Sequence, residues 1–265
     1  MTTSICDLEE AAARGWRAPE ELPLGRWRLR AAEGFTGRAN SALAIGDPGM
    51  PLAAAIDEVG RWYRARGLPA MVAVPFPVAG PEDSPVDRFL GQELGWAVRS
   101  SAVIVMTAET GQVAGQAADP AVRVDLEPEP DPAWLALYRF RGEKPPPISR
   151  RLLMSAPWQA FASVRAGGAT IAIGRVAAAG DWAGLTAVEV DPGQRRRGLG
   201  RAVTGALAAA AAARGVAGLY LQVEQTNAAA RRLYRQTGFA DHHVYHYRVA
   251  SPPSGTGAAK PGRAR

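Results

Sequence analysis

The residues best suited to chemistry in this chain form one basic, glycine-containing segment that follows a predicted strand and precedes a predicted helix. A glycine-rich turn at a helix N-terminus presents free backbone N–H groups, and the helix dipole adds partial positive charge there. The segment therefore predicts an anion-binding site, with pyrophosphate as the expected ligand. Its members are Arg195, Arg196, Arg197, Gly198, Leu199, Gly200 and Arg201.

A second group of polar residues lies further along the chain. Asn227 ends a predicted strand and can cap the helix expected from Ala228, in which Tyr234 lies. A phenol titrates near pKa ~10 and a thiol near ~8.5, so a neutral tyrosine beside a thiolate can donate a proton or a hydrogen bond. Packing on the apolar side of its helix is the alternative role for Tyr234.

The two groups together resemble one known family. Neither the Gly-Lys-Ser/Thr of a nucleoside-triphosphate P-loop nor the further glycine of a dinucleotide-binding turn is present. Arg195-x-x-Gly198-x-Gly200 instead resembles the acyl-CoA pyrophosphate loop of the GNAT superfamily of N-acyltransferases. Asn227, followed by Leu233-Tyr234 and Gly238-Phe239, resembles the second signature of that family. The alternative for the loop alone is a basic turn that caps a surface helix.

The resemblance implies a fold, a donor and several site residues. It implies an α/β fold (α+β in some schemes) with a mixed, mostly antiparallel sheet flanked by helices, and acetyl-CoA as the acyl-donor cosubstrate. The strand before the loop, Val188, Glu189 and Val190, would bind the cofactor arm, with the Val190 N–H polarising the thioester carbonyl. Tyr234 would serve the leaving thiolate, and Asn227 would contact the arm of CoA.

The sequence leaves open which group removes the proton from the amine. Some family members have a glutamate five residues before the asparagine, where this chain has Gln222. Glu189 and Glu224 are the nearby carboxylates, although either could be solvated or paired with an arginine. A base acting through water, or an acceptor that arrives as free amine, needs no carboxylate. Alternation along the strand places Glu189 opposite to Val188 and Val190.

Three histidines follow the second signature. His242, His243 and His246 have spacing that resembles a metal cluster, but nothing nearby in the sequence completes a site. They are expected instead on an edge strand beside the substrate cleft, and no metal is predicted.

The elements that must position these residues follow from periodicity and turn signals. Helices are expected over 7–14, 52–66, 86–94, 133–140 and 148–154, from about 201, and from 228. Strands are expected over 27–31, 41–45, 70–74, 97–106, 159–165, 169–176, 185–190 and 219–227.

The order of elements indicates two related halves. Arg66-Gly67 parallels Arg214-Gly215, and Gly95-Trp96 parallels Gly238-Phe239, unless both matches are coincidence. We expect a degenerate GNAT-like domain over 1–118, an acidic Pro-rich linker over 119–131, a catalytic GNAT domain over 132–250 and a disordered basic tail over 251–265. Gly91 falls opposite Tyr234 in this alignment, so the first half is predicted to be catalytically silent.

Composition and charge narrow the classes of partner that the protein is expected to bind. The net charge of +6 gathers at the anion loop and the tail of the 265-residue chain, which argues against nucleic-acid binding. The single cysteine, Cys6, excludes an internal disulfide and fits a reducing, cytoplasmic setting. The start of the chain does not resemble a signal peptide, and the longest apolar run, 206–213, is too short for a membrane span.

We therefore expect an N-acetyltransferase that passes an acetyl group directly to a primary amine of a small-molecule or peptide acceptor, with no membrane partner and with its oligomeric state open. A non-enzymatic acyl-CoA-binding or sensing module is the main alternative. A third possibility is a two-step or large-substrate acyltransferase in which both halves shape the acceptor site.

Overall fold

The computed structural model describes residues 3–116, 121–140 and 142–250. The predicted basic tail and residues 119 and 120 of the predicted linker lie outside the described residues. The first half contains α1 (Ile5–Gly15), β1 (Glu20–Leu24), β2 (Trp27–Ala31), β3 (Ala42–Leu43), α2 (Leu52–Arg64), β4 (Met71–Phe76), α3 (Pro85–Arg88), a π-helical turn (Phe89–Glu93), β5 (Ala97–Val98), β6 (Val103–Glu109) and α4 (Thr110–Ala114).

The second half has the elements that carry the two sequence motifs. They are β7 (Asp125–Glu127), α5 (Pro132–Leu137), α6 (Ile148–Leu153), β8 (Trp158–Ala166), β9 (Ala169–Ala179), β10 (Trp182–Val190), a 3-10 turn (Pro192–Gln194), α7 (Leu199–Ala212), β11 (Gly218–Glu224), α8 (Ala228–Gln236) and β12 (Ala240–Val249).

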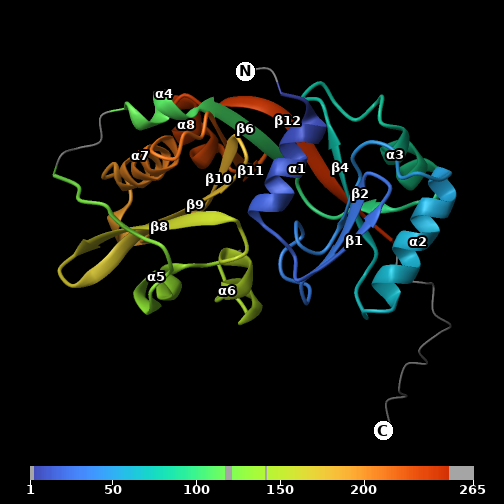
Figure 1. The fold of residues 1–265 in the computed structure, drawn as a ribbon, viewed down its shortest axis with the longest axis horizontal. Helices are drawn as coiled ribbons and strands as arrows, with labels where there is room; N and C mark the ends of the chain where they lie inside the picture. Colours follow the sequence, from blue (N-terminus) through green and yellow to red (C-terminus); the bar gives the residue numbers. More distant parts are fainter. Residues whose placement is uncertain (1–2, 117–120, 141, 251–265) are drawn as a thin grey trace, which may run out of the picture.

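All twelve strands belong to one sheet (Figure 1), in the order β1-β2-β3-β4-β12-β6-β11-β10-β9-β8-β7, with β5 paired to β12. Only β3 with β4 and β10 with β11 pair in parallel. The mixed, mostly antiparallel sheet flanked by helices is therefore confirmed.

Helices cover both faces of this sheet. On one face, α4, α7 and α8 pack over the strands of the second half, and α2 packs over those of the first. On the other face, α1 lies over the middle of the sheet, and α5 and α6 lie beside it over β8 and β9 (Figure 1). Alternation along β11 shows the division, because Leu219 and Leu221 face α7 whereas Tyr220 faces α1.

Short polar side chains begin the helices that frame the site. The Ser4 hydroxyl accepts the Asp7 N–H at 3.1 Å and caps α1. The Asn227 side chain accepts the Ala230 N–H at 3.1 Å and caps α8, as predicted. α7 begins at Leu199, two residues earlier than expected, and alanine, the best helix former, fills most of its second half.

The strand expected over 97–106 is interrupted. β5 and β6 both lie on the same side of β12, but the pairing shifts between Val98 and Val103. The Arg99 N–H still bonds to the Tyr247 carbonyl at 3.0 Å. The small polar residues Ser100 and Ser101 lie in the interruption, where the two strands lose their register.

The two halves exchange their last strands. β6, from the first half, lies between β11 and β12, whereas β12, from the second half, lies between β4 and β6. Each last strand thus pairs with a strand of the other half, and the two pair with each other. The sheet is therefore shared by the halves, and their division into folding units at 118 and 132 stays a prediction.

The Pro-rich segment before α5 contributes to the sheet. β7 pairs with β8, and Arg165 contacts Asp125 at 3.2 Å and Asp131 at 2.6 Å. Asp131 also accepts the Trp134 N–H and caps α5. The acidic residues of the predicted linker are therefore used in local contacts.

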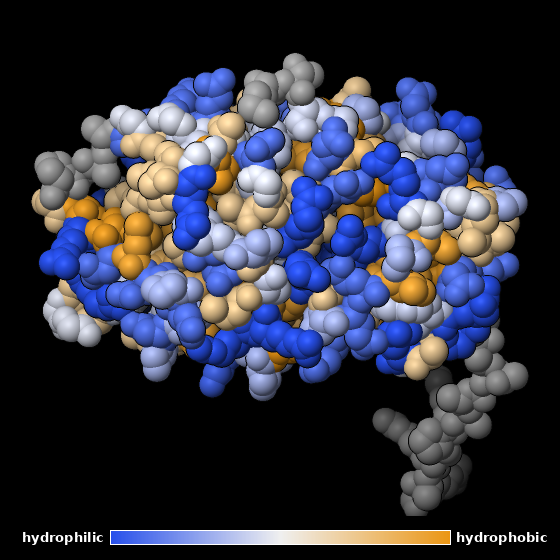
Figure 2. All heavy atoms as spheres, in the orientation of Figure 1, coloured by the Kyte–Doolittle hydropathy of each residue, from blue (hydrophilic) through white to orange (hydrophobic). Residues whose placement is uncertain are grey.

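The visible face of the molecule is largely hydrophilic, with apolar side chains in small groups (Figure 2). The large apolar residues that are exposed in the described structure are Leu22, Met50, Val78, Leu94, Val98 and Leu126. None of the helices in the described ranges is both long and apolar enough to cross a membrane.

Candidate functional site

β10 and β11 diverge at the centre of the candidate site. Their parallel pairing covers Trp182 to Leu185 against Gly218 to Leu221 and then stops, although β10 continues to Val190 and β11 to Glu224. A bulge in β10 between Thr186 and Glu189, with Ala187 at φ +53°, bends the strand at this point. The facing backbone edges beyond the bulge are left for a ligand.

The Val190 N–H lies on this open edge. The Asp191 N–H donates to the Ile171 carbonyl of β9 at 2.9 Å, and Val190 stands opposite Ala172 in the same register. Successive N–H groups of a strand alternate in direction, so the Val190 N–H points away from β9, toward β11. The N–H predicted to polarise a carbonyl is thus placed where β10 has no ladder partner in the described structure.

The anion loop leads from this edge directly into α7. Arg196 at φ +67° and Gly198 at φ +75° adopt the left-handed conformation, so the chain turns sharply before Leu199. The first N–H groups of α7 have no partner within the helix, as at any helix start. The four arginines predicted for this site, Arg195, Arg196, Arg197 and Arg201, are all exposed.

The two glycines of the loop have different structural roles. Gly198 needs its positive φ, which a side chain would strain. Gly200 is helical, but a Cβ there would lie 3.3 Å from Leu233 Cδ2 of α8 and 3.9 Å from Val190 Cγ2. Gly200 therefore allows the start of α7 to approach α8 and the open edge of β10.

Tyr234 lies on α8, on the α7 side of the sheet. Its ring packs edge-on against Phe239, with 5.8 Å between centroids, and against the core beneath α7. Burial raises the pKa of Tyr234 to about 12, so the phenol is neutral at physiological pH. Its hydroxyl makes no hydrogen bond within the described residues, which leaves the proton available to a ligand.

The two candidate bases differ in their surroundings. The Glu189 carboxylate accepts the Arg139 N–H at 2.9 Å, and it lies on the opposite side of the sheet from Val188 and Val190. Burial raises the pKa of Glu189, and Arg139 and Arg195 offset only part of that effect. Glu224 is exposed at the end of β11. A raised pKa suits Glu189 better as a base near neutral pH.

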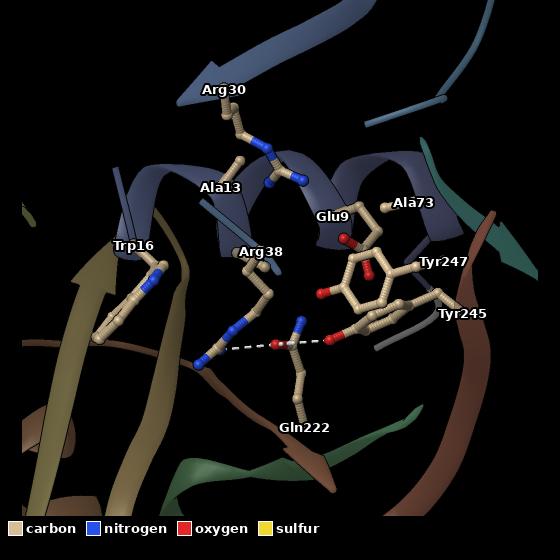
Figure 3. A pocket seen from close by; sticks show the side chains of 10 residues that line it. Glu9, Ala13, Trp16, Arg30, Arg38, Ala73, Gln222, Tyr245 and Tyr247 are labelled. Carbon is tan, nitrogen blue, oxygen red and sulfur yellow. Dashed lines mark hydrogen bonds between the residues drawn. The ribbon is translucent and has the colours of Figure 1, made fainter. Parts of the chain in front are cut away.

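A narrow pocket opens on the α1 side of the sheet, and the sequence did not identify it. Figure 3 shows Glu9 of α1, Trp16 directly after α1, Arg38, and Tyr245 and Tyr247 of β12 around Gln222. The Gln222 amide oxygen accepts an N–H of Arg38 at 2.7 Å and the Tyr245 hydroxyl at 3.4 Å. Arg38 lies 184 positions from Gln222 in the chain, so no local pattern could indicate the contact.

Tyr138 lies in the core cluster under α5 and α6, with its ring 5.5 Å from that of Trp134. Burial raises the pKa of Tyr138 to about 12. The charge of Arg38 lowers this pKa and the charge of Glu189 raises it, each by less than burial does. The Phe35 and Phe140 rings meet at 4.9 Å and close this side of the site with residues from both halves.

The prediction that the three histidines lie on an edge strand is wrong. β12 is a central strand, because it pairs with β4 on one side and with β6 on the other. His243 is fully buried, with Nε2 2.8 Å from the Glu9 carboxylate of α1, and His246 contacts Asp87 of α3. Two of these histidines thus bind separate acidic residues of the first half.

Known proteins resemble this chain along nearly all of its length. Residues 2–248 match the family model described as "Probable histone acetyltransferase Rv0428c C-terminal". The chain is 32% identical over 251 residues to the "Probable histone acetyltransferase Rv0428c" of Mycobacterium tuberculosis, covering 93% of this chain and 74% of that protein. It is 28% identical over 250 residues to the "Uncharacterized N-acetyltransferase YobR" of Bacillus subtilis, covering 92% and 98%.

Solved structures show the same fold. A GCN5-related N-acetyltransferase from Kribbella flavida superposes with a TM-score of 0.67 at 18% identity, over 96% of this chain and 98% of that one. A tandem GNAT protein from the clavulanic acid biosynthesis pathway gives 0.66 at 13% identity, over 96% and 91%.

Proposed function

The chain belongs to the GNAT family of N-acetyltransferases, and on this premise we propose that it transfers the acetyl group of acetyl-CoA directly to the primary amine of an acceptor. The observation that carries the proposal is the divergence of β10 and β11, which leaves the Val190 N–H on a free strand edge beside the start of α7. One strand edge and one helix start thus offer donors to a carbonyl and to a pyrophosphate.

In this proposal the pyrophosphate of CoA binds the loop from Arg195 to Arg201, and the arm of CoA lies along Val188, Glu189 and Val190. Asn227, whose oxygen caps α8, keeps its amide N–H groups for the same arm. The thioester carbonyl accepts the Val190 N–H, which stabilises the oxyanion formed when the amine attacks.

Two side chains then handle the protons. Glu189 takes a proton from the acceptor nitrogen as the C–N bond forms, and Glu224 is the second candidate for this role. The C–S bond breaks, and the CoA thiolate receives a proton from the Tyr234 hydroxyl. Direct transfer needs no acyl-enzyme, and Cys6 packs against the core cluster under α1.

We propose that the first half binds no CoA. The turn that corresponds to the anion loop contains Asp47, whose carboxylate already accepts the Gly49 N–H at 2.7 Å. The hairpin between β1 and β2 fills the space beside this turn, since a Cβ on Gly25 would lie 2.2 Å from Pro48. The Asp47 carbonyl accepts the Arg26 N–H as well. A pyrophosphate would meet a negative side chain and few free donors.

Calorimetry of CoA binding tests the donor site. We expect one CoA per chain and much weaker binding of dephosphorylated pantetheine, which lacks the pyrophosphate. Gly200→Val should weaken CoA binding because its side chain meets Leu233 and Val190. Gly205→Val is the matched control, because a Cβ at Gly205 in the same helix meets nothing within 4 Å. Equal affinity for CoA and pantetheine would contradict the pyrophosphate assignment.

Release of free CoA thiol from acetyl-CoA, measured over a panel of amines, tests the reaction itself. The panel should include a lysine-containing histone-tail peptide, because the Mycobacterium tuberculosis relative is named a probable histone acetyltransferase. Amine-dependent thiol release supports the proposal. Tight CoA binding without release for any amine would favour the non-enzymatic CoA-binding module.

A further inference from the structure

Arg38 carries a charge that the protein does not balance. Its Nη1 donates to the neutral amide oxygen of Gln222 at 2.7 Å, and no carboxylate among the described residues forms an ion pair with it. The side chain is half-buried and lies over the Trp16 ring, with 5.1 Å from Cζ to the ring centroid. The remaining N–H groups of its guanidinium have no hydrogen-bond partner within the described structure.

The groups around Arg38 add to this positive charge. Arg30 lines the same pocket and is 4% exposed, but it donates only to the carbonyl and hydroxyl of Ser41. Arg175 is fully buried and lies over the Trp16 ring at 5.3 Å, with the Leu153 and Gly15 carbonyls among its acceptors. Neither arginine forms an ion pair in the described structure.

One carboxylate, that of Glu9, lines the pocket together with Arg30 and Arg38. Glu9 is 5% exposed, and its Oε1 lies 2.8 Å from His243 Nε2. In Figure 3 Glu9 and Arg38 lie on different sides of the pocket, with the Tyr247 hydroxyl between them. Glu9 thus contacts His243 and forms no ion pair with Arg38 in the described structure. A half-buried guanidinium without an ion-pair partner is free to form charge-assisted hydrogen bonds with an anionic ligand.

The partner of Arg38 explains why its charge is free. An amide oxygen accepts a hydrogen bond but supplies no negative charge, whereas a glutamate of the same shape at position 222 would form an ion pair with Arg38. The pocket holds about 10 Å³, which is the space of one water-sized group. It therefore admits one oxygen of a ligand carboxylate beside Arg38 and leaves the rest of the ligand outside the pocket.

We propose that the acceptor carries a carboxylate besides its amine, and that Arg38 binds this carboxylate through a charge-assisted hydrogen bond. The proposal rests on the proposed acetyl transfer and adds the chemical class of the acceptor: an amino acid or a similar small amino carboxylate. The carboxylate of the ligand supplies the charge that Gln222 lacks, and the amine stays outside the pocket.

Matched acceptors test the proposal on the full chain. Thiol release from acetyl-CoA is measured with the common amino acids, with their carboxamides and with the corresponding amines that lack the carboxylate. We expect kcat/KM to favour the carboxylates by about 10- to 100-fold, the effect of one hydrogen bond to a charged group. Equal kcat/KM across each matched set would overturn the proposal and leave the acetyl transfer intact.

Three variants test whether the preference for carboxylates comes from Arg38. Arg38→Gln should abolish the preference for carboxylates, whereas Arg38→Lys, which keeps the charge, should retain part of it. Gln222→Glu should reduce the preference, because the new carboxylate neutralises Arg38. Arg61→Gln is the matched control, since Arg61 lies exposed on α2 and pairs with Glu58. An unchanged preference in Arg38→Gln, with an unchanged melting temperature, would assign the selectivity to another residue.

A binding measurement separates this inference from the reaction. Amino acids should raise the melting temperature of the CoA-bound protein more than their carboxamides do, and Arg38→Gln should remove the difference. This result without any thiol release would contradict the proposed transfer but support the role of Arg38. Thiol release without any carboxylate-dependent shift, in protein whose Arg38 variants match the wild type, would contradict the role of Arg38.

Discussion

Tyr234, the proposed acid, and Glu189, the proposed base, lie on opposite faces of the sheet. Tyr234 packs in the core beneath α7, and Glu189 lies on the side of α5, where it accepts the Arg139 N–H. An acid on one face and a base on the other match the two protons that move in acetyl transfer, since one leaves the amine and one reaches the thiolate. Each role is testable by itself.

For Tyr234 the informative change is Tyr234→Phe, which removes the hydroxyl and keeps the ring on Phe239. We expect kcat to fall on the order of 10²-fold where chemistry limits the rate. The melting temperature should not change, because the hydroxyl makes no hydrogen bond within the described residues. Stopped-flow thiol release under saturating acetyl-CoA measures the effect. Unchanged turnover would leave Tyr234 with a packing role alone.

For Glu189 the informative measurement is a pH profile. Burial raises the pKa of Glu189, and a base works only when deprotonated, so activity should fall as the pH decreases through that raised pKa. Glu189→Gln should lower kcat/KM by about 10²-fold and remove this acidic limb. Glu224→Gln is the comparison. If Glu224→Gln removes the limb and Glu189→Gln does not, Glu224 is the base.

The anion loop and the α8 cap, which the sequence indicated, share one property: each adjoins, in the chain, the element that it serves. The loop from Arg195 to Arg201 directly follows its strand, and Asn227 caps the helix that begins at the next residue. Arg38, by contrast, meets Gln222 only because α1 and the loop after β2 pack across β11 and β12. Spacing carries no signal for such a contact.

β12 is the element that joins the two halves most firmly. Asp87 of α3 binds its His246 and receives two hydrogen bonds of 2.8 Å from its Arg248. Burial acts to raise the pKa of Asp87, but the hydrogen bonds from Arg248 and His246 outweigh burial and lower it below the ordinary value. The ionised carboxylate is thus the stabilising form.

Asp87→Asn should therefore destabilise the fold by about 1–3 kcal/mol near neutral pH, the usual effect of hydrogen bonds to a charged group. A lowered pKa gives stability that is present above the unfolded pKa of about 4 and is lost as the pH falls through the folded pKa. Urea unfolding at several pH values measures the difference, which should shrink below pH ~4. Asp83→Asn, on an exposed residue of the same segment, should have little effect at any pH.

Most helices and strands could be predicted from the sequence. The strands that could not be predicted were missed for clear physical reasons. The helices from Leu52, Leu199 and Ala228 show apolar spacing or caps that act locally. β1 contains Pro23 and two glutamates, and β7 lies in a Pro-rich acidic segment, so composition argues against strand in both. Both are the edge strands of the sheet, where proline and charge are tolerated because one side stays unpaired.

At the scale of the whole molecule, the exchange of β6 and β12 limits how far either half can fold without the other. A fragment of residues 1–118 would keep β4 and β6 but lose β12, which lies between them. Sequence similarity between the halves indicated two units, but neighbours in a sheet are set by long-range pairing that a linear pattern does not encode. The central position of the histidine-bearing strand was missed for the same reason.

Residues 1–118 and 121–265 expressed separately should each fail to give a cooperative unfolding transition, and coexpression of the two should restore it. Size-exclusion chromatography and thermal unfolding by circular dichroism provide the measurement. A monomeric 1–118 fragment with a sharp transition of its own would show that the first half completes its sheet without β12.

The exchange also has a consequence for biosynthesis. A ribosome makes β12 after every other strand of the sheet, yet β12 stands at the junction of the two halves. Until it emerges, the nascent chain holds β4 and β6 with open edges, which are templates for pairing with other chains. A stop codon at Ala240, the first of the 10 residues of β12, would therefore remove a central strand. Such truncations should behave as aggregating products rather than as shortened enzymes.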